Sequence, residues 1–271
     1  MPGATRRPRL KHVDDQMTFT EHLGELRDRL IKTILAVGAG AIVVFLFYDP
    51  ILTFLGGPYE DFCRNSPQQC SLGGDFIITG PLDGFGIRLK VAGWGGLALA
   101  LPVVLWQLWR FITPGLHPKE KKYAVPFILS AVALFFLGAA VAYWTLPKAL
   151  DFLISFSGSS VTSAFTPNSY ISFIVVMMAA FGISFLFPVL LVFLELAGVV
   201  TPKTLSSFRR YAWVIIVIFA AVITPSGDPY SMLALAVPMV LFYEISILIG
   251  RLIMRSRAKA EARAAASSTT A

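Results

Sequence analysis

The stretch AVPFILSAVALFFLGAAVAYWTL, residues 124–146, decides the fold class of this chain. It contains no Asp, Glu, Lys or Arg. A helix needs about 20 apolar residues to cross roughly 30 Å of hydrocarbon, and this run is long enough to do so. The stretch therefore predicts a membrane-spanning helix.

Five further apolar runs flank this segment, at about 30–48, 88–112, 169–194, 211–224 and 231–250. The whole chain is 56% hydrophobic and only 14% charged, a composition typical of membrane proteins. Six spans and their short loops use up the 271 residues and leave no room for a soluble catalytic domain. We therefore predict an all-α membrane protein with six transmembrane helices.

The basic residues are sorted between the two sides of this predicted bundle. Nineteen of the 23 Lys and Arg residues fall in the N-terminal part up to Lys32, in alternate gaps between runs with the edge residue Arg110 included, or after Gly250. Acidic residues show no such sorting, as expected for a rule that concerns Lys and Arg alone. This pattern predicts a multi-pass protein of the cytoplasmic (inner) membrane with both termini in the cytoplasm. It also explains the net charge of +7 without a nucleic-acid partner.

Three regions follow from these boundaries. Residues 1–17 form a basic N-terminal tail that we expect to be flexible, and residues 256–271 form a C-terminal cytoplasmic tail that we expect to be disordered. The membrane domain occupies residues 18–255. The first apolar run starts near Leu30 and is longer than the apolar core of a cleavable signal, so we interpret it as a span.

Several spans and loops are irregular. Only about 13 positions of residues 211–223 are clearly apolar, which corresponds to roughly 20 Å of helix and predicts a short fifth span. Pro188 and Pro238 predict kinks in the fourth and sixth spans. Outer residues 49–87 show little periodicity, and residues 147–168 are expected to hold a short surface helix. The chain has no internal repeat of the kind found in many secondary transporters.

Both cysteines, Cys63 and Cys70, lie in the first outer segment. On the oxidising side of a membrane such a pair predicts a disulfide, although two free thiols remain the alternative. We predict no metal site, because all three histidines fall on the inner side.

An amphipathic stretch precedes the first span. Residues 18–21 have the spacing of a capping box, and an apolar stripe follows at helical intervals. The carboxylates of this stretch, which include Glu25, lie on a different face of the predicted helix from the apolar stripe. The spacing alone is equally typical of an interfacial helix whose charges pair with one another or with lipid.

No motif of an enzyme or cofactor site occurs in the sequence. Four charged residues border the spans within about two turns of their ends, where they can reach the interface, and we interpret them as structural: Arg88, Lys90, Glu195 and Glu244. The inner loop at residues 109–122 contains one carboxylate, Glu120, among basic residues. Taken without the rest of the chain, this loop indicates only that Glu120 forms ion pairs with the neighbouring basic residues.

A family pattern nevertheless runs through the chain. HLGELRDRL at residues 22–30 resembles the H-L-x-E-L-R-x-R-L pattern of TatC, the multispanning receptor subunit of the twin-arginine protein translocase. PVVLWQLW (102–109), FITPGL (111–116) and KEKK (119–122) resemble its second span and the following loop. FGISF (181–185) with Pro188, and the later segments 224–225, 236–238 and 243–244, continue the match in order over roughly residues 19–255.

This resemblance implies a receptor for signal peptides that carry consecutive arginines. A guanidinium is a planar fork that suits bidentate bonding to a carboxylate, whereas a lysine ammonium is a point charge, so two acids can distinguish an arginine pair from a lysine pair. The residues implied to contact the peptide at the cytoplasmic face are Glu25, Arg27, Arg29, Phe111, Pro114 and Glu120.

The resemblance also implies partners. These are single-span TatA/TatB-type subunits, membrane lipid and further copies of the chain within the complex. The docking residues are expected to be Gln107, Thr224, Ser226 and Glu244. Transport of folded proteins would draw on the proton-motive force, without a cofactor or an enzymatic reaction.

The chain departs from the family at Leu186, where the family often has a glutamate in F-G-x-x-F-E-x-P. The main alternative function is a small-solute secondary transporter, which would need polar groups at the bilayer midplane. An intramembrane enzyme would need a catalytic pair at that depth. The sequence shows neither feature, whereas a purely structural scaffold stays open.

Overall fold

The computed structural model describes residues 19–67, 70, 80–112, 124–156, 166–196 and 198–269, with the side chains of residues 19–21, 112 and 257–269 left out. Within these ranges the chain forms eight helices: α1 (Phe19–Leu46), α2 (Tyr48–Asn65), α3 (Asp83–Ile112), α4 (Ala124–Ser155), α5 (Pro167–Ser184), α6 (Phe187–Leu196), α7 (Pro202–Ile223) and α8 (Pro229–Thr269). With α5 and α6 counted together, six of these segments are long and apolar enough to cross a membrane. The predicted all-α, six-span fold is confirmed.

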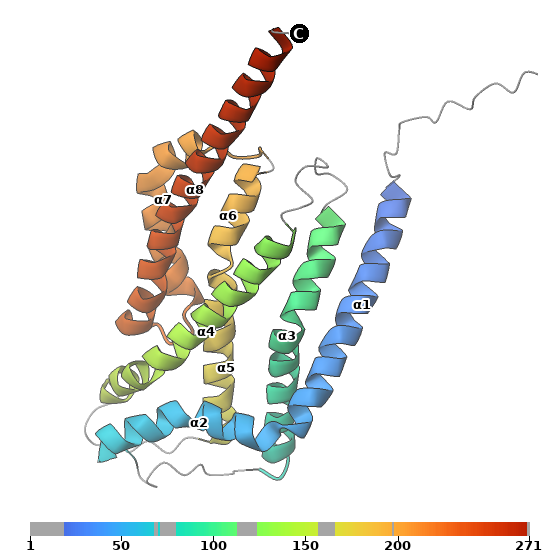
Figure 1. Ribbon diagram of the computed structural model, residues 1–271. Coiled ribbons are helices and arrows are strands. Elements are labelled where there is room, and N and C mark those ends of the chain that lie inside the picture. The colour runs from blue at the N-terminus through green and yellow to red at the C-terminus, as the bar shows by residue number, and fades with distance from the viewer. Residues whose placement is uncertain are drawn as a thin grey trace, which may run out of the picture.

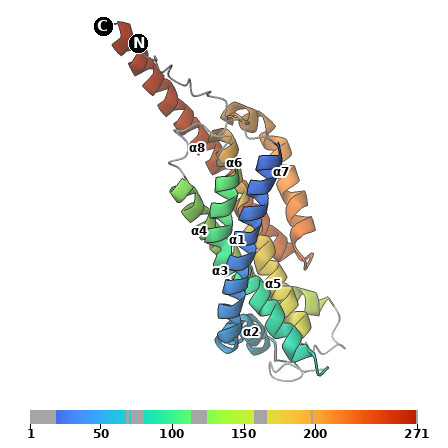
Figure 2. The same cartoon turned by 90° about the vertical axis from the view of Figure 1, so that its right-hand side faces the viewer.

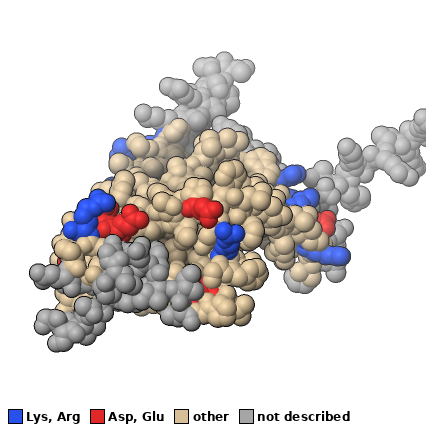
Figure 3. Space-filling model, turned by 90° about the horizontal axis from the view of Figure 1, so that it is seen from below, with Lys and Arg blue, Asp and Glu red and all other residues tan. Residues whose placement is uncertain are grey.

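The helices form an elongated bundle in which α1 begins and α8 ends at the same end (Figures 1 and 2). The helix α2 lies across the opposite end. Seen from that end, charged side chains appear as a few separate groups on a mostly uncharged surface (Figure 3). The core lies where α4, α5 and α8 meet, and Leu146, Met177 and Leu235 there are fully buried.

Close contact between glycines holds α1 against α3. A Cβ on Gly40 would lie 2.7 Å from the carbonyl oxygen of Gly96, and a Cβ on Gly96 would overlap the backbone nitrogen of Ala41. Small residues allow two membrane helices to approach this closely. The outer side of α1, including Ile34 and Leu35, is exposed, as expected for a lipid-facing surface.

The amphipathic helix α2 was not predicted, so the expectation of little regular structure at the start of residues 49–87 is wrong. Tyr59 and Phe62 of α2 are buried. The hydroxyls of Tyr143 and Tyr170 donate to the carbonyl oxygens of Phe54 and Leu55, at 2.8 and 2.9 Å, and fasten α2 to α4 and α5. Glycines and Pro58 inside the helix hid its periodicity from the sequence analysis.

A disulfide joins Cys63, near the end of α2, to Cys70, with the two Cα atoms 5.6 Å apart.

The separate surface helix expected at residues 147–168 is not found at its predicted start. Instead, α4 continues without a break through Pro147 to Ser155, because Ala149 and Leu150 still face the core.

The fourth span is broken where Pro188 predicted a kink. The helix α5 ends at Ser184 and α6 begins at Phe187, which places Pro188 in the first turn of α6, where its missing N–H costs little. Pro238, by contrast, lies inside α8, which continues past it.

The fifth span is longer than predicted. The helix α7 begins at Pro202 and has 22 residues, because Thr201 caps it by accepting from the Thr204 N–H at 3.2 Å, and its polar first turns are helical. A prediction from apolar positions alone does not include these polar turns. Similarly, α8 extends past residue 255 to Thr269, so the expected boundary at residue 255 is not a helix end.

Candidate functional site

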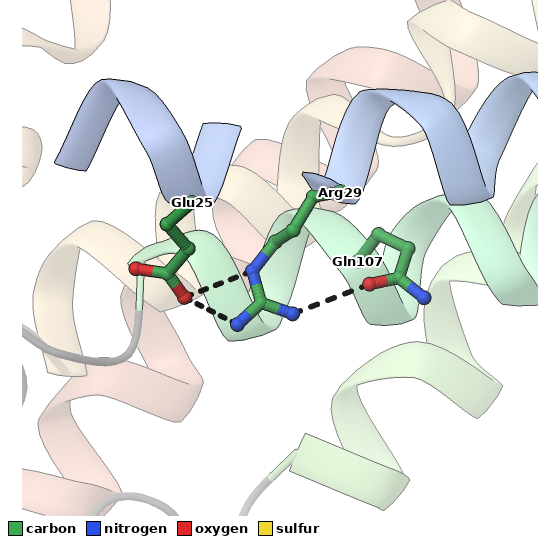
Figure 4. A network of polar contacts seen from close by, with 3 residues as sticks. All are labelled: Glu25, Arg29 and Gln107. Atoms are coloured by element: carbon green, nitrogen blue, oxygen red, sulfur yellow. Dashed lines mark hydrogen bonds and ion pairs between the residues drawn. The ribbon is translucent and has the colours of Figure 1, made fainter. Parts of the chain in front are cut away.

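A polar network connects α1 to α3 near the end of the bundle where α1 begins (Figure 4). The Arg29 guanidinium donates through Nε to Glu25 Oε1 at 3.0 Å and pairs with the same oxygen through Nη2. Its third nitrogen, Nη1, donates to Gln107 Oε1 at 3.2 Å. Glu25 and Arg29 lie one helical turn apart on α1, so the spacing that the sequence predicted brings them together.

The network is partly shielded from solvent. The side chains of Arg29 and Glu25 are only 14% and 17% exposed. The second carboxylate oxygen, Glu25 Oε2, is buried and accepts no hydrogen bond from any residue that the structure describes. A buried acceptor without a donor is costly, so this oxygen marks a position where a donor from another molecule would be stabilising.

Aromatic residues lie at the same end of α1 and α3. The His22 ring of α1 stacks on Phe111 of α3, with centroids 4.4 Å apart and planes 17° from parallel. Arg27 is exposed and takes no part in the network. Of the six predicted peptide-contacting residues, the structure brings together Glu25 and Arg29, and it places Phe111 at the same pair of helices.

The other two predicted contact residues, Pro114 and Glu120, lie outside the described residues. The ends of their segment are known. The helix α3 ends at Ile112 and α4 begins at Ala124, both at the end of the bundle where α1 begins (Figure 1).

The residues expected at a partner-docking surface are dispersed. Gln107 belongs to the Arg29 network. Thr224 is buried and donates to the Ala220 carbonyl oxygen at 2.8 Å, and Ser226 bonds to Asp228. Glu244 forms an ion pair with Arg209 at 2.7 Å and accepts from the Trp213 indole at 3.2 Å. Among the described residues, these four side chains form no single surface.

The charged residues at the span edges differ in their surroundings. Arg88 lies over the Tyr48 ring, and Lys90 donates to Asn168 at 2.6 Å and to Ser172 at 2.8 Å, as a structural role predicts. Glu195, however, is buried among the helices. It is 9% exposed, it packs against Gly250, and neither of its oxygens has a partner in the described part of the chain.

Leu186 lines an apolar hollow of about 270 Å³ together with Trp94, Leu101 and Met178. An apolar side chain suits these surroundings. No group of three potential metal ligands comes together among the residues described.

The roles of two residues at this site, His22 and Gln107, were not predicted. His22 opens the HLGELRDRL motif but was assigned no role, and Gln107 was assigned to partner docking. The spacing on α1 could not identify either contact, because both depend on which face of α3 packs against α1.

The model of the family "Sec-independent protein translocase protein (TatC)" matches residues 21–238. The chain belongs to the TatC family. The Sec-independent protein translocase protein TatC of Frankia casuarinae is 41% identical over 245 residues, which cover 88% of this chain and 66% of that protein. The TatC protein of Aquifex aeolicus is 38% identical over 244 residues. These residues cover 89% of this chain and 98% of that protein.

A solved structure agrees with this assignment. The crystal structure described as the twin-arginine translocase receptor TatC is 38% identical and has a TM-score of 0.68. The match covers 86% of this chain and 99% of that one. The resemblance found in the sequence is therefore confirmed at the level of the TatC family and of the fold.

Proposed function

We propose that this chain is the core subunit and signal-peptide receptor of a twin-arginine translocase. It binds twin-arginine signal peptides at the cytoplasmic face of the inner membrane and supports export of folded proteins, driven by the proton-motive force. The observation that carries the proposal is the shielded Glu25 carboxylate, whose Oε2 lacks a donor among the described residues. Membership of the TatC family supports the same function.

The network explains how Glu25 would bind an arginine. Arg29 occupies only Oε1 and is itself held by Gln107, so the carboxylate is fixed, and its buried Oε2 has no donor among the described residues. A peptide guanidinium that donates to Oε2 forms a charge-assisted hydrogen bond, which contributes about 1.5–3 kcal/mol. Partial shielding from water strengthens this contact relative to a fully exposed pair.

We assign the second arginine of the signal to Glu120. The helices that flank its segment, α3 and α4, end and begin at the bundle end that holds Glu25. Two carboxylates at one face can each accept a guanidinium fork. A lysine pair keeps the charge but loses the fork geometry, so it binds more weakly.

Orientation and partners follow from the same scheme. The bundle end that holds Glu25 is assigned to the cytoplasm because basic residues concentrate in the segments on that side. Single-span TatA/TatB-type subunits and further copies of this chain are the proposed partners, and they would use the exposed apolar faces of the outer helices. No cofactor and no enzymatic step are part of the proposal.

An export assay tests the proposal. The chain is expressed with TatA/TatB-type subunits in cells that lack their own TatC, together with a folded reporter behind an Arg-Arg signal. The expected result is export of the reporter that is lost when Lys-Lys replaces Arg-Arg. A reporter behind a Sec signal controls for general secretion. Equal export of the Arg-Arg and Lys-Lys reporters, or none although the chain is inserted in the membrane, would overturn the proposal.

A further inference from the structure

A basic pocket lies between the start of α7 and residues 251–255 of α8. Its lining includes Lys203, Ser206 and Ser207 from α7 and Arg251 and Arg255 from α8. Its volume is about 540 Å³, and all three of its cationic side chains are exposed. Arg251 and Arg255 are four residues apart on α8 and therefore face the same side of that helix.

The pocket has three positive charges, and no carboxylate is among its lining residues. Arg251 Nη2 donates to Ser206 Oγ at 2.9 Å, which holds that guanidinium at the pocket wall. Lys203 and Arg255 make no hydrogen bond or ion pair with any side chain that the structure describes. By contrast, Arg209, two turns further along α7, is neutralised by Glu244 at 2.7 Å. The charge of the pocket is thus left for a ligand.

The start of α7 adds to this charge. Its first backbone N–H groups point toward the end of the helix where Lys203 lies, and a helix N-terminus carries a partial positive charge. Pro202 has no N–H, and Thr201 accepts from the Thr204 N–H through its hydroxyl and from the Leu205 N–H through its carbonyl, so the Lys203 N–H is the first-turn donor that faces the pocket end. Anions, phosphate groups above all, are favoured at such a position when cationic side chains surround it.

Apolar surface adjoins the basic groups. Pro202 and Met254 complete the lining, and Leu248 and Leu252 of α8 are exposed nearby along the same helix. The pocket lies at the ends of the two candidate spans Pro202–Ile223 and Pro229–Ser256, where a span meets the headgroup region. A molecule with an anionic head and an apolar body would match both parts.

We propose that this pocket binds an anionic phosphate group, of the kind carried by a phospholipid headgroup or by free phosphate. Basic pockets between transmembrane helices at the headgroup level are suited to anionic lipid heads. Lys203, Arg251 and Arg255 contact the phosphate oxygens. The site is separate from Glu25 and Arg29 on α1, so it stands independently of the proposed receptor function.

Native mass spectrometry of the full chain in detergent tests the proposal, with titration of phosphatidylglycerol and, separately, phosphatidylcholine. Phosphatidylglycerol is expected to bind more tightly than phosphatidylcholine. Lys203→Gln and Arg255→Gln are each expected to weaken phosphatidylglycerol binding about fivefold, the usual effect of one basic residue near a membrane surface. Arg210→Gln is the matched control, because Arg210 lies on α7 but does not line the pocket.

Competition with inorganic phosphate identifies the source of the group. Lipid binding that persists in excess phosphate assigns the pocket to a phospholipid, whereas displacement by phosphate, with direct binding of phosphate by calorimetry, assigns it to the free ion. Equal binding of the two lipids together with no phosphate binding would overturn the proposal. So would an Arg210→Gln variant as weak as the two pocket variants, because the effect would then be general surface charge. Unfolding temperatures of all variants exclude misfolding as the cause.

Discussion

At the scale of single residues, the site depends on how Glu25 is held. Arg29 and Gln107 fix one side of the carboxylate, and Oε2 is left without a donor in the described residues. Gln107 touches Arg29 and acts on a ligand of Glu25 only through it, so it is a positioning residue. This arrangement converts an ordinary ion pair between neighbouring helical turns into a preorganised acceptor.

Gln107→Leu tests this positioning role. The substitution leaves Arg29 Nη1 without its acceptor, and loss of one such hydrogen bond costs about 1 kcal/mol. We expect an Arg-Arg signal peptide to bind about fivefold more weakly, while the affinity for a Lys-Lys peptide changes little. Fluorescence titration of labelled peptides against the purified protein measures both affinities. Unchanged affinity for the Arg-Arg peptide would show that Gln107 does not position the site.

Gly250→Ala probes the buried Glu195. A Cβ at position 250 would overlap the Glu195 carboxylate, which is buried but is the far end of a flexible side chain, so we expect the substitution to destabilise the protein by about 1 kcal/mol. The added Glu195→Ala removes the overlapping group and should restore much of the loss. Thermal unfolding in detergent measures the effect. Gly93→Ala is the control, because a Cβ there meets nothing within 4 Å; equal effects at the two glycines would contradict the account.

At the scale of helices, the site is built by packing of α1 on α3. Their close approach at Gly40 and Gly96 sets the height at which Arg29 and Gln107 face each other. A substitution in the contact between α1 and α3 should therefore also alter the hydrogen bonds of the Glu25 network, although it lies far from them.

Gly96→Ala tests the link between packing and site. The new Cβ would overlap the backbone of Ala41, which cannot yield as a side chain does, so α1 must move away from α3. We expect destabilisation of about 1–3 kcal/mol and weaker binding of an Arg-Arg peptide. Unfolding and peptide titration are measured on the same samples. Gly38→Ala on α1, where a Cβ meets nothing within 4 Å, should change neither. A stable Gly96→Ala protein would refute the close helix contact.

The disulfide between Cys63 and Cys70 also acts on a helix, because it closes a short loop at the end of α2. Cys70→Ser opens that loop, and for a loop of this length the expected loss of stability is about 2 kcal/mol. A reducing agent should lower the unfolding temperature of the unmodified protein to that of the variant and leave the variant unchanged. If reduction has no effect on the unmodified protein, the disulfide does not stabilise α2.

At the scale of the whole molecule, the sequence predicts those features of the fold that depend on hydrophobicity and charge along the chain. The six spans and the break near Pro188 were predicted, because long apolar runs and proline act locally. The helix α2 and the polar start of α7 were missed, since α2 depends on burial of Tyr59 and Phe62 against other helices and α7 on a cap at Thr201.

The candidate site divides in the same way. Glu25 and Arg29 were both predicted as site residues, and their spacing on one helix brings them together. The contacts of Gln107 and His22 were not predicted, because they cross between α1 and α3. Thr224 was expected at a docking surface but is buried, a fact that depends on how α7 packs on its neighbours.

The most direct test of the central claim is photocrosslinking of signal peptides to this protein in native membranes. An Arg-Arg peptide is compared with its Lys-Lys twin on the unmodified chain, on Glu25→Gln and on Glu120→Ala. Asp28→Asn is the control, because it removes a neighbouring charge that is exposed and outside the network. We predict crosslinks that need both arginines, that are lost in the Glu25 and Glu120 variants and that persist in the control. Equal crosslinking of the two peptides, or crosslinks that survive both carboxylate substitutions, would contradict the receptor assignment.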